Sequence, residues 1–145
     1  MNAKKIYLAD DDSDDIMIFT IVLKEICPQC TVISFNNGLE LMEGLKDSTE
    51  KPDLIFLDIN MPVVCGLNAL ESIRKNYPED RIPVMMYSTS ANDDYILKAH
   101  NLGADFYCIK PFDLEKIKIC ISHFINMEFT PERPQTKLSE FLLKW

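Results

Sequence analysis

Five side chains that can bind a metal ion or a phosphoryl group each stand directly after a short apolar run. They are Asp10, Asp11, Asp58, Ser88 and Lys110. Three carboxylates brought together repel one another at neutral pH unless positive charge compensates them. Lys110 would compensate one of the three negative charges, and a divalent cation would compensate the other two. Oxygen ligands suit Mg²⁺, so these residue types predict a magnesium site if the fold gathers them.

A site of this kind can accept a phosphoryl group. A carboxylate such as Asp58 acts as a nucleophile and forms an aspartyl phosphate when a metal and a cation neutralise the incoming group. Ser88 could donate a hydrogen bond to one phosphoryl oxygen, and Lys110 could pair with another. Taken singly, Asp58 could instead cap the loop before a helix, and Ser88 could be a simple turn hydroxyl.

The apolar runs before these residues are typical of strands that are buried on both faces. Each run is bounded by Asp, Asn, Gly, Pro or Lys. The predicted strands are residues 6–9, 31–35, 54–57, 84–87 and 106–109.

Between the strands, apolar residues recur at the spacing of one helix face. The predicted helices are residues 16–26, a weaker 39–45, 67–77, 95–102 and 114–125. Strands and helices that alternate five times predict an α/β fold with a parallel sheet and helices on both faces. Sites in such sheets lie at the carboxyl ends of the strands, where the five chemically active residues would converge.

The acidic stretch LADDDSDD near the N-terminus could be a solvated surface, a helix start or a site. Asp10 and Asp11 follow the first strand, so we assign them to the site. Asp12 or Ser13 is placed to cap the first helix. Residues 14–15 then fall in its first turn, where the helix dipole favours negative charge.

Composition narrows the classes of partner. The chain has 145 residues and a net charge of −8, which duplex DNA or an anionic membrane would repel. An acidic surface suits cations or basic partner surfaces instead. No apolar run approaches the roughly 20 residues needed to cross a bilayer.

The five cysteines form no short disulfide framework, and no signal peptide precedes them, so we expect a cytoplasmic protein with reduced thiols. Cys27-Pro-Gln-Cys30 is a CxxC that could be redox-active or half of a zinc site, but it lacks a second pair of ligands. His100 and His123 stand alone downstream and are interpreted as surface or packing residues.

Four motifs in order resemble the receiver domain of two-component response regulators. They are IYLADDD, PDLIFLDINMPVVCGLNAL, IPVMMYSTSA and GADFYCIKPF. Asp58 and Ser88 are 30 residues apart, and Ser88 and Lys110 are 22 apart, which is usual for that family. The resemblance covers roughly residues 5–127 and implies a flavodoxin-like (βα)5 doubly wound sheet of five parallel strands, order 2-1-3-4-5.

The resemblance also implies a role for each acidic residue. Asp58 looks like the phosphoacceptor. Asp11 and Asp58 would ligate Mg²⁺ directly, and Asp10 would act through water. Asn60 would lend its backbone carbonyl to the metal.

The remaining motif positions imply a switch. Ser88 matches the switch hydroxyl, and Tyr107 matches the switch aromatic, although an aromatic in a final strand also needs no special reason to be there. Lys110 matches the lysine of the phosphorylation site. The bond from Lys110 to Pro111 is cis in similar proteins, which a tertiary amide permits at modest cost.

By this resemblance the chain is a stand-alone receiver that serves as a signalling switch or phosphorelay intermediate. A histidine kinase or histidine phosphotransfer protein would donate the phosphoryl group, and a downstream protein would receive the signal. The chain would catalyse only its own phosphorylation and dephosphorylation, without binding DNA. The alternative is a non-phosphorylated module that uses the same fold for protein interaction.

We divide the chain into a receiver domain, residues 1–128, and a C-terminal part, residues 129–145. The C-terminal part begins with a proline-containing connector. Its last residues carry an apolar stripe typical of a short amphipathic helix: Leu138, Phe141, Leu142 and Trp145. A helix this short needs a surface to lie on. It could pack on its own domain or dock on a partner, and a homodimer could form through it or through the face of the last two βα units.

Overall fold

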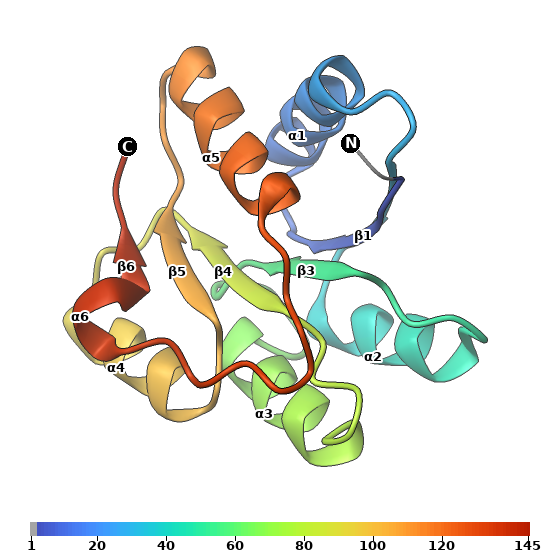
Figure 1. Cartoon of the computed structure of the whole chain (residues 1–145), viewed down its shortest axis with the longest axis vertical. Coiled ribbons are helices and arrows are strands. Elements are labelled where there is room, and N and C mark those ends of the chain that lie inside the picture. The colour runs from blue at the N-terminus through green and yellow to red at the C-terminus, as the bar shows by residue number, and fades with distance from the viewer. Residues whose placement is uncertain (1–2) are drawn as a thin grey trace.

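Six parallel strands form one sheet in the computed structural model of the chain, which describes residues 3–145 (Figure 1). The strands are β1 (Lys5–Ala9), β2 (Thr31–Phe35), β3 (Leu54–Leu57), β4 (Val84–Ser88), β5 (Phe106–Ile109) and β6 (Leu142–Leu143). Their order across the sheet is β2-β1-β3-β4-β5-β6. The predicted α/β class and the order 2-1-3-4-5 are confirmed, and β6 is an additional edge strand.

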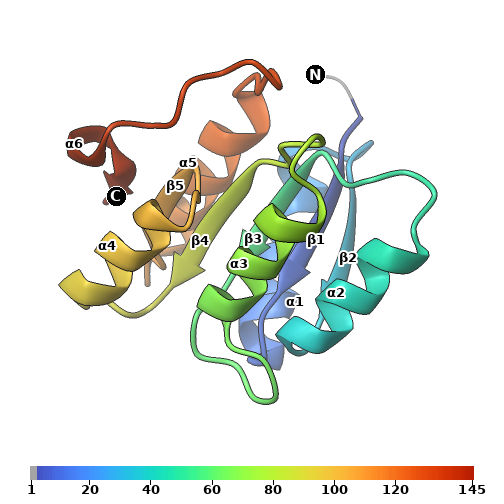
Figure 2. The same ribbon diagram turned by 90° about the horizontal axis from the view of Figure 1, so that it is seen from below.

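Helices cover both faces of the sheet. One face carries α1 (Ser13–Ile26) and α5 (Leu114–Asn126). The other face carries α2 (Gly38–Asp47), α3 (Gly66–Asn76) and α4 (Asp93–Asn101), as Figure 2 shows from a second side. None of the helices within residues 3–145 has the length and apolar character needed to cross a membrane.

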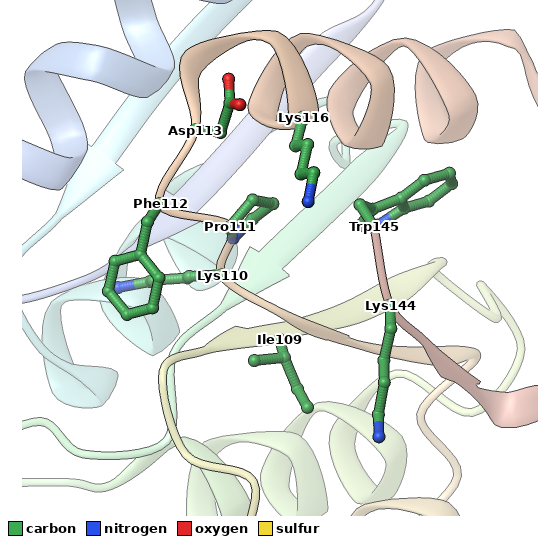
Figure 3. Close-up of a pocket in the computed structure, with 8 residues that line it drawn as sticks. All are labelled: Ile109, Lys110, Pro111, Phe112, Asp113, Lys116, Lys144 and Trp145. Atoms are coloured by element: carbon green, nitrogen blue, oxygen red, sulfur yellow. The ribbon is translucent and has the colours of Figure 1, made fainter.

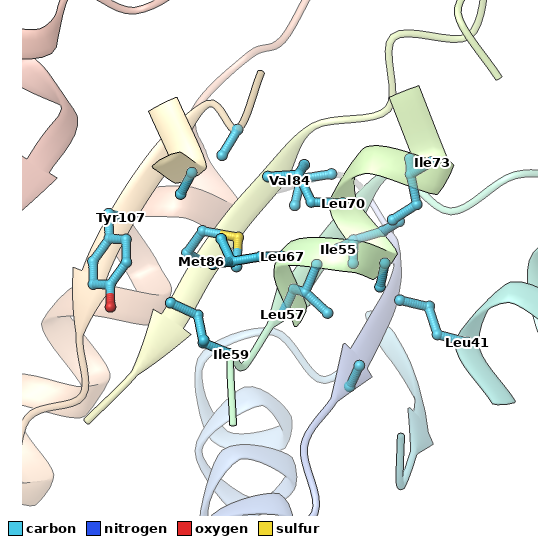
Figure 4. Packing of buried hydrophobic residues seen from close by; sticks show 14 of the residues in the cluster. Leu41, Ile55, Leu57, Ile59, Leu67, Leu70, Ile73, Val84, Met86 and Tyr107 are labelled. Atoms are coloured by element: carbon cyan, nitrogen blue, oxygen red, sulfur yellow. The ribbon is translucent and has the colours of Figure 1, made fainter. Parts of the chain in front are cut away.

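Successive residues of the central strands face opposite helical layers. In β3, Ile55 and Leu57 pack against α2 and α3, whereas Leu54 and Phe56 pack in the core beneath α1 and α5. Figure 4 shows the first of these two cores, with Tyr107 at its β5 side. Because both faces are covered, these strands are continuous apolar runs without polar alternation.

The C-terminal apolar stripe does not lie on one helix, contrary to the prediction. Helix α6 (Leu138–Phe141) has only four residues, and the chain then pairs in parallel with β5 as β6. So short a helix gains little stability of its own, whereas the open edge of β5 offers backbone groups for pairing. Of the two alternatives, the structure shows packing on the chain's own domain, with Phe141 fully buried.

Cys27 and Cys30 form a disulfide, which corrects the expectation of reduced thiols for this pair. Cys65, Cys108 and Cys120 are not disulfide-bonded. They lie in the turn between α1 and β2, where the Cys30 N–H donates to the Cys27 carbonyl at 3.0 Å. This turn folds the four residues back on themselves, so side chains three positions apart meet. The overall number of cysteines does not report on such a local approach.

Candidate functional site

Charged side chains converge at the carboxyl edge of the sheet. Asp10 and Asp11 follow β1, and Asp58 follows β3. Each carboxylate offers an oxygen, and these oxygens lie within 4.8 Å of one another. They meet because β1 and β3 are parallel neighbours and end at the same edge.

Lys110 joins this cluster from the end of β5. Its Nζ atom lies 2.6 Å from Asp10 Oδ2 and 3.1 Å from Asp58 Oδ2. Its backbone N–H donates to the Ser88 carbonyl, which fixes the start of the loop. Lys110 and Asp10 are both almost fully buried, so this pairing takes place largely out of water.

Asp15 also belongs to the cluster, although the sequence predicts only that it lies in the first turn of α1. Its Oδ2 atom accepts a hydrogen bond from Lys110 Nζ at 2.9 Å. Asp12 caps α1 by accepting from the N–H groups of Asp14 and Asp15, as predicted for Asp12 or Ser13. Helix side chains lean toward the helix N-terminus, so a residue three after the cap points back to the end of β1. The spacing of three residues between the cap and Asp15 is the feature of the sequence that could have predicted its place in the cluster.

The electrostatics of the cluster favour an added cation. Burial raises the pKa of Asp10 to about 6, even though the Lys110 hydrogen bond and the Asp12 N–H act in the opposite direction. Burial alone would lower the pKa of Lys110, but its hydrogen bonds to Asp10 and Asp15 and the charge of Asp58 raise it. One ammonium group therefore balances several carboxylates only in part. The donor set and its charge fit a divalent metal ion.

Asp58 and its neighbours present oxygen atoms toward the surface. Asp58 is 7% exposed, and its Oδ1 atom accepts a hydrogen bond from the Ile59 N–H at 2.7 Å. Asp11 and Asn60 are exposed. The cluster can thus be reached from solvent on the side of Asp11 and Asn60, while Asp10 forms its buried floor.

Gly66 allows the loop between β3 and α3 to close over Asp58. Its N–H donates to the Ile59 carbonyl at 2.8 Å. A Cβ atom at this position would lie 1.9 Å from the Asp58 carbonyl oxygen. Only glycine permits this approach, so Gly66 shapes the site.

Ser88 and Tyr107 meet at the loop that follows β4. Ser88 is fully buried, and its Oγ atom accepts a hydrogen bond from the Ser90 N–H at 3.2 Å. The Tyr107 hydroxyl donates to the Ser90 carbonyl at 2.7 Å. Burial raises the pKa of Tyr107, which keeps the hydroxyl protonated as a donor. Both side chains therefore contact the same short segment.

The Lys110–Pro111 peptide bond is trans, which corrects the expected cis bond. The trans form of such a bond is favoured by only about 0.5–1 kcal/mol, so residue type does not fix the isomer. Pro111 borders a pocket of about 410 Å³ between the β5–α5 loop and the end of the chain (Figure 3). The pocket is lined by Ile109, Lys110, Pro111, Phe112, Asp113, Lys116, Lys144 and Trp145. The three clustered carboxylates are not part of its lining.

Comparison with known proteins identifies close counterparts of this fold. The profile of the response regulator receiver domain matches residues 6–122. Response regulator Rcp1 of Synechocystis sp. is 30% identical over 119 residues, which are 79% of this chain and 81% of that protein. The crystal structure of the phosphorylated cyanobacterial phytochrome response regulator RcpA has a TM-score of 0.78 at 30% identity, covering 85% of this chain and 91% of that chain. The Mn²⁺-bound form of Rcp1 has a TM-score of 0.75 at 28% identity, covering 83% and 91%.

Other relatives are much longer. Hybrid signal transduction histidine kinase G of Dictyostelium discoideum is 34% identical over 128 residues, which are 86% of this chain but 4% of that protein. The transcriptional regulator NtrC of Escherichia coli strain K12 is 32% identical over 123 residues, 82% of this chain and 25% of that protein. The chain thus spans a small part of each of these two relatives. The matched residues 6–122 include the whole carboxylate cluster and Lys110, and the chain belongs to the response regulator receiver domain family.

Proposed function

We propose that Asp58 accepts a phosphoryl group from a phosphohistidine of a histidine kinase or histidine phosphotransfer protein. The observation that supports this most directly is the Asp58 carboxylate itself, 3.1 Å from the Lys110 ammonium and beside two further carboxylates. In the transfer, an Asp58 oxygen bonds to phosphorus while the bond from phosphorus to the histidine nitrogen breaks and imidazole leaves. Lys110 stabilises the negative charge that gathers on the phosphoryl oxygens.

We propose Mg²⁺ as the ion of this site. Asp11, Asp58 and the backbone carbonyl of Asn60 would hold it directly, and Asp10 would hold it through water. The clustered carboxylate oxygens and the raised pKa of Asp10 support this assignment, as does the Mn²⁺-bound form of the relative Rcp1. When bound, the ion would neutralise charge on the incoming phosphoryl group.

Phosphorylation would act through Ser88 and Tyr107. A phosphoryl group adds about −1.5 to −2 charge, and the Ser88 hydroxyl would donate to one of its oxygens. Tyr107 and Ser88 both form hydrogen bonds with Ser90 in the loop after β4. The two side chains would therefore move together and alter the face formed by α4, β5 and α5. That face would pass the signal to a protein partner, a second copy included, by a shift between two states.

Incubation with acetyl phosphate and Mg²⁺, followed by mass spectrometry of the intact protein, tests the proposal. We expect one added phosphoryl group on the wild type and none on Asp58→Asn. Asp80→Asn removes an exposed carboxylate before β4, away from the cluster, and should be phosphorylated like the wild type. Binding of beryllium fluoride in the presence of Mg²⁺ is a second test of the site, because it needs no phosphoryl transfer.

The alternative function is a protein-interaction module that keeps the fold without being phosphorylated. Under that alternative the wild type would show neither a phosphoryl adduct on Asp58 nor a response to beryllium fluoride. Either response at Asp58 would exclude it.

A further inference from the structure

The last eight residues, 138–145, run along the outer edge of β5 between α4 and α5, and we call them the C-terminal strap (Figure 1). On the α4 side, the Phe141 ring lies 5.0 Å from the His100 ring. On the α5 side, the Trp145 ring lies 5.2 Å from the His123 ring. Between them β6 pairs with β5, so the strap occupies the face through which we propose that the signal leaves.

Phe141 is the strap residue that contacts the proposed switch. It is 0% exposed and belongs to the same core as Tyr107. The two ring centroids are 6.4 Å apart, and Leu142 is the register partner of Tyr107. The tyrosine is thus held at its hydroxyl by Ser90 and along its ring by the strap.

Hydrogen bonds and an ion pair also hold the segment that precedes the strap, residues 133–137. The His100 Nε2 atom lies 2.7 Å from the Thr136 carbonyl oxygen, and the Gln135 amide donates to the His100 carbonyl at 2.7 Å. Arg133 Nε lies 2.7 Å from Asp105 Oδ1. These contacts keep the strap close to β5, so its docking costs less conformational entropy than docking of a free tail.

We propose that Phe141 is a positioning residue that holds Tyr107 in its buried position, so that docking of the strap and phosphorylation of Asp58 favour each other. The second part rests on the proposed function. Tyr107 and Phe141 are both 0% exposed, so we expect Tyr107 to become accessible at the edge of β5 when Phe141 leaves. If the buried tyrosine is the state that a phosphoryl group stabilises, each event must strengthen the other by the same factor, because coupling between sites is reciprocal.

The first test needs no phosphorylation. Tetranitromethane nitrates accessible tyrosines, and peptide mapping by mass spectrometry locates them. We expect Tyr107 to be protected in the wild type and nitrated in Phe141→Ala, while the partly exposed Tyr77 and Tyr95 react in both. Leu138→Ala is the matched control, because Leu138 lies on the same strap and is 50% exposed. Equal protection of Tyr107 in Phe141→Ala would overturn the positioning role.

The second test measures the coupling. Trp145 is the only tryptophan of the chain, and it lies on the strap, so its quenching by acrylamide reports docking. Beryllium fluoride with saturating Mg²⁺ should reduce that quenching in the wild type. Phe141→Ala should bind beryllium fluoride at least about fivefold more weakly, whereas Leu138→Ala should bind like the wild type.

Further variants separate positioning from general stability. Phe141→Leu keeps a large apolar side chain and should recover most of the affinity. If Phe141→Ala does not fold, Phe141→Val, which still removes the ring that contacts Tyr107, takes its place in both tests. In a Tyr107→Ala background, Phe141→Ala should weaken binding no further. An equal loss in that background, or unchanged Trp145 quenching on binding, would overturn the coupling. A wild type that binds no beryllium fluoride would instead refute the proposed function, while the nitration result would still decide the positioning role.

Discussion

Lys110 is the cation of the carboxyl edge and has three carboxylate partners. Asp10, Asp15 and Asp58 all lie within 3.1 Å of its Nζ atom. Lys110→Met should lower the free energy of unfolding by about 3 kcal/mol in metal-free buffer, because it leaves buried carboxylates without a partner. The same variant should bind Mg²⁺ more tightly and accept a phosphoryl group poorly.

Chemical denaturation in the presence of EDTA and calorimetric titration with Mg²⁺ measure these effects. Lys116→Met is the control, because Lys116 is exposed on the neighbouring helix α5. Unchanged stability together with unchanged Mg²⁺ affinity would show that Lys110 does not balance the cluster.

Asp10 makes stability depend on pH. Its pKa rises from 3.8 to about 6 on folding, chiefly through burial, so the folded state binds the proton more tightly than the unfolded state. Its stabilising contribution is complete below pH 4 and is lost as the pH rises toward about 6. Metal-free wild type should therefore lose stability relative to Asp10→Asn over this range. Thermal unfolding in EDTA at pH 4, 5, 6 and 7.5 measures the difference, and a constant difference would contradict the prediction.

The residues of the cluster could be predicted because strand ends are visible in the sequence. Each of Asp10, Asp58 and Lys110 ends an apolar run, and parallel strands place such ends together. Asp15 was not assigned, because its place in the cluster depends on where α1 starts and how it turns. The isomer of the Pro111 bond is decided by the surrounding packing, which no single residue reveals.

At the level of elements, the loop between β3 and α3 requires a glycine at position 66, because a side chain there would meet the backbone of Asp58. Gly66→Ala would bring a Cβ atom to 1.9 Å from the Asp58 carbonyl oxygen, so backbone must move. We expect a loss of about 1–3 kcal/mol in the free energy of unfolding and weaker Mg²⁺ binding, since Asp58 would be displaced. Asn68→Ala, on an exposed position of the same helix, should change neither quantity. Denaturation and Mg²⁺ titration of both variants test this.

Helices and strands with a clear periodicity of apolar residues could be predicted from the sequence. Elements whose structure depends on pairing with another part of the fold could not. The central strands and α1 follow from local patterns of apolar residues. The stripe from Leu138 to Trp145 has helical spacing as well, yet the chain pairs with β5 after Phe141. The free edge of β5 decided this outcome, and that edge exists only once the sheet has formed.

Across the whole molecule, Arg133 ties the connector to the sheet. It contacts Asp105 and donates from Nη2 to the Arg81 carbonyl at 3.0 Å. Arg133→Ala should raise the rate of proteolysis within residues 129–137 severalfold, because the connector loses these bonds and opens more often. Asp105 keeps Arg74 as a partner, so global stability should fall by no more than about 1–2 kcal/mol.

Limited digestion with proteinase K, which does not depend on Lys or Arg, followed by mass spectrometry measures the opening, and Lys137→Ala serves as an exposed control in the same connector. Cleavage at an unchanged rate in Arg133→Ala would show that other contacts hold the connector.

The pairing of β6 also changes what the sheet presents to other molecules. An uncovered outer strand displays a row of N–H and C=O groups that a strand of a neighbouring molecule can join, and this is a common route to aggregation. Opposite Tyr107 and Cys108 these groups face β6 instead. The two residues of β6 therefore act as a terminator of the sheet, and they protect the chain against growth into intermolecular β-structure at that edge.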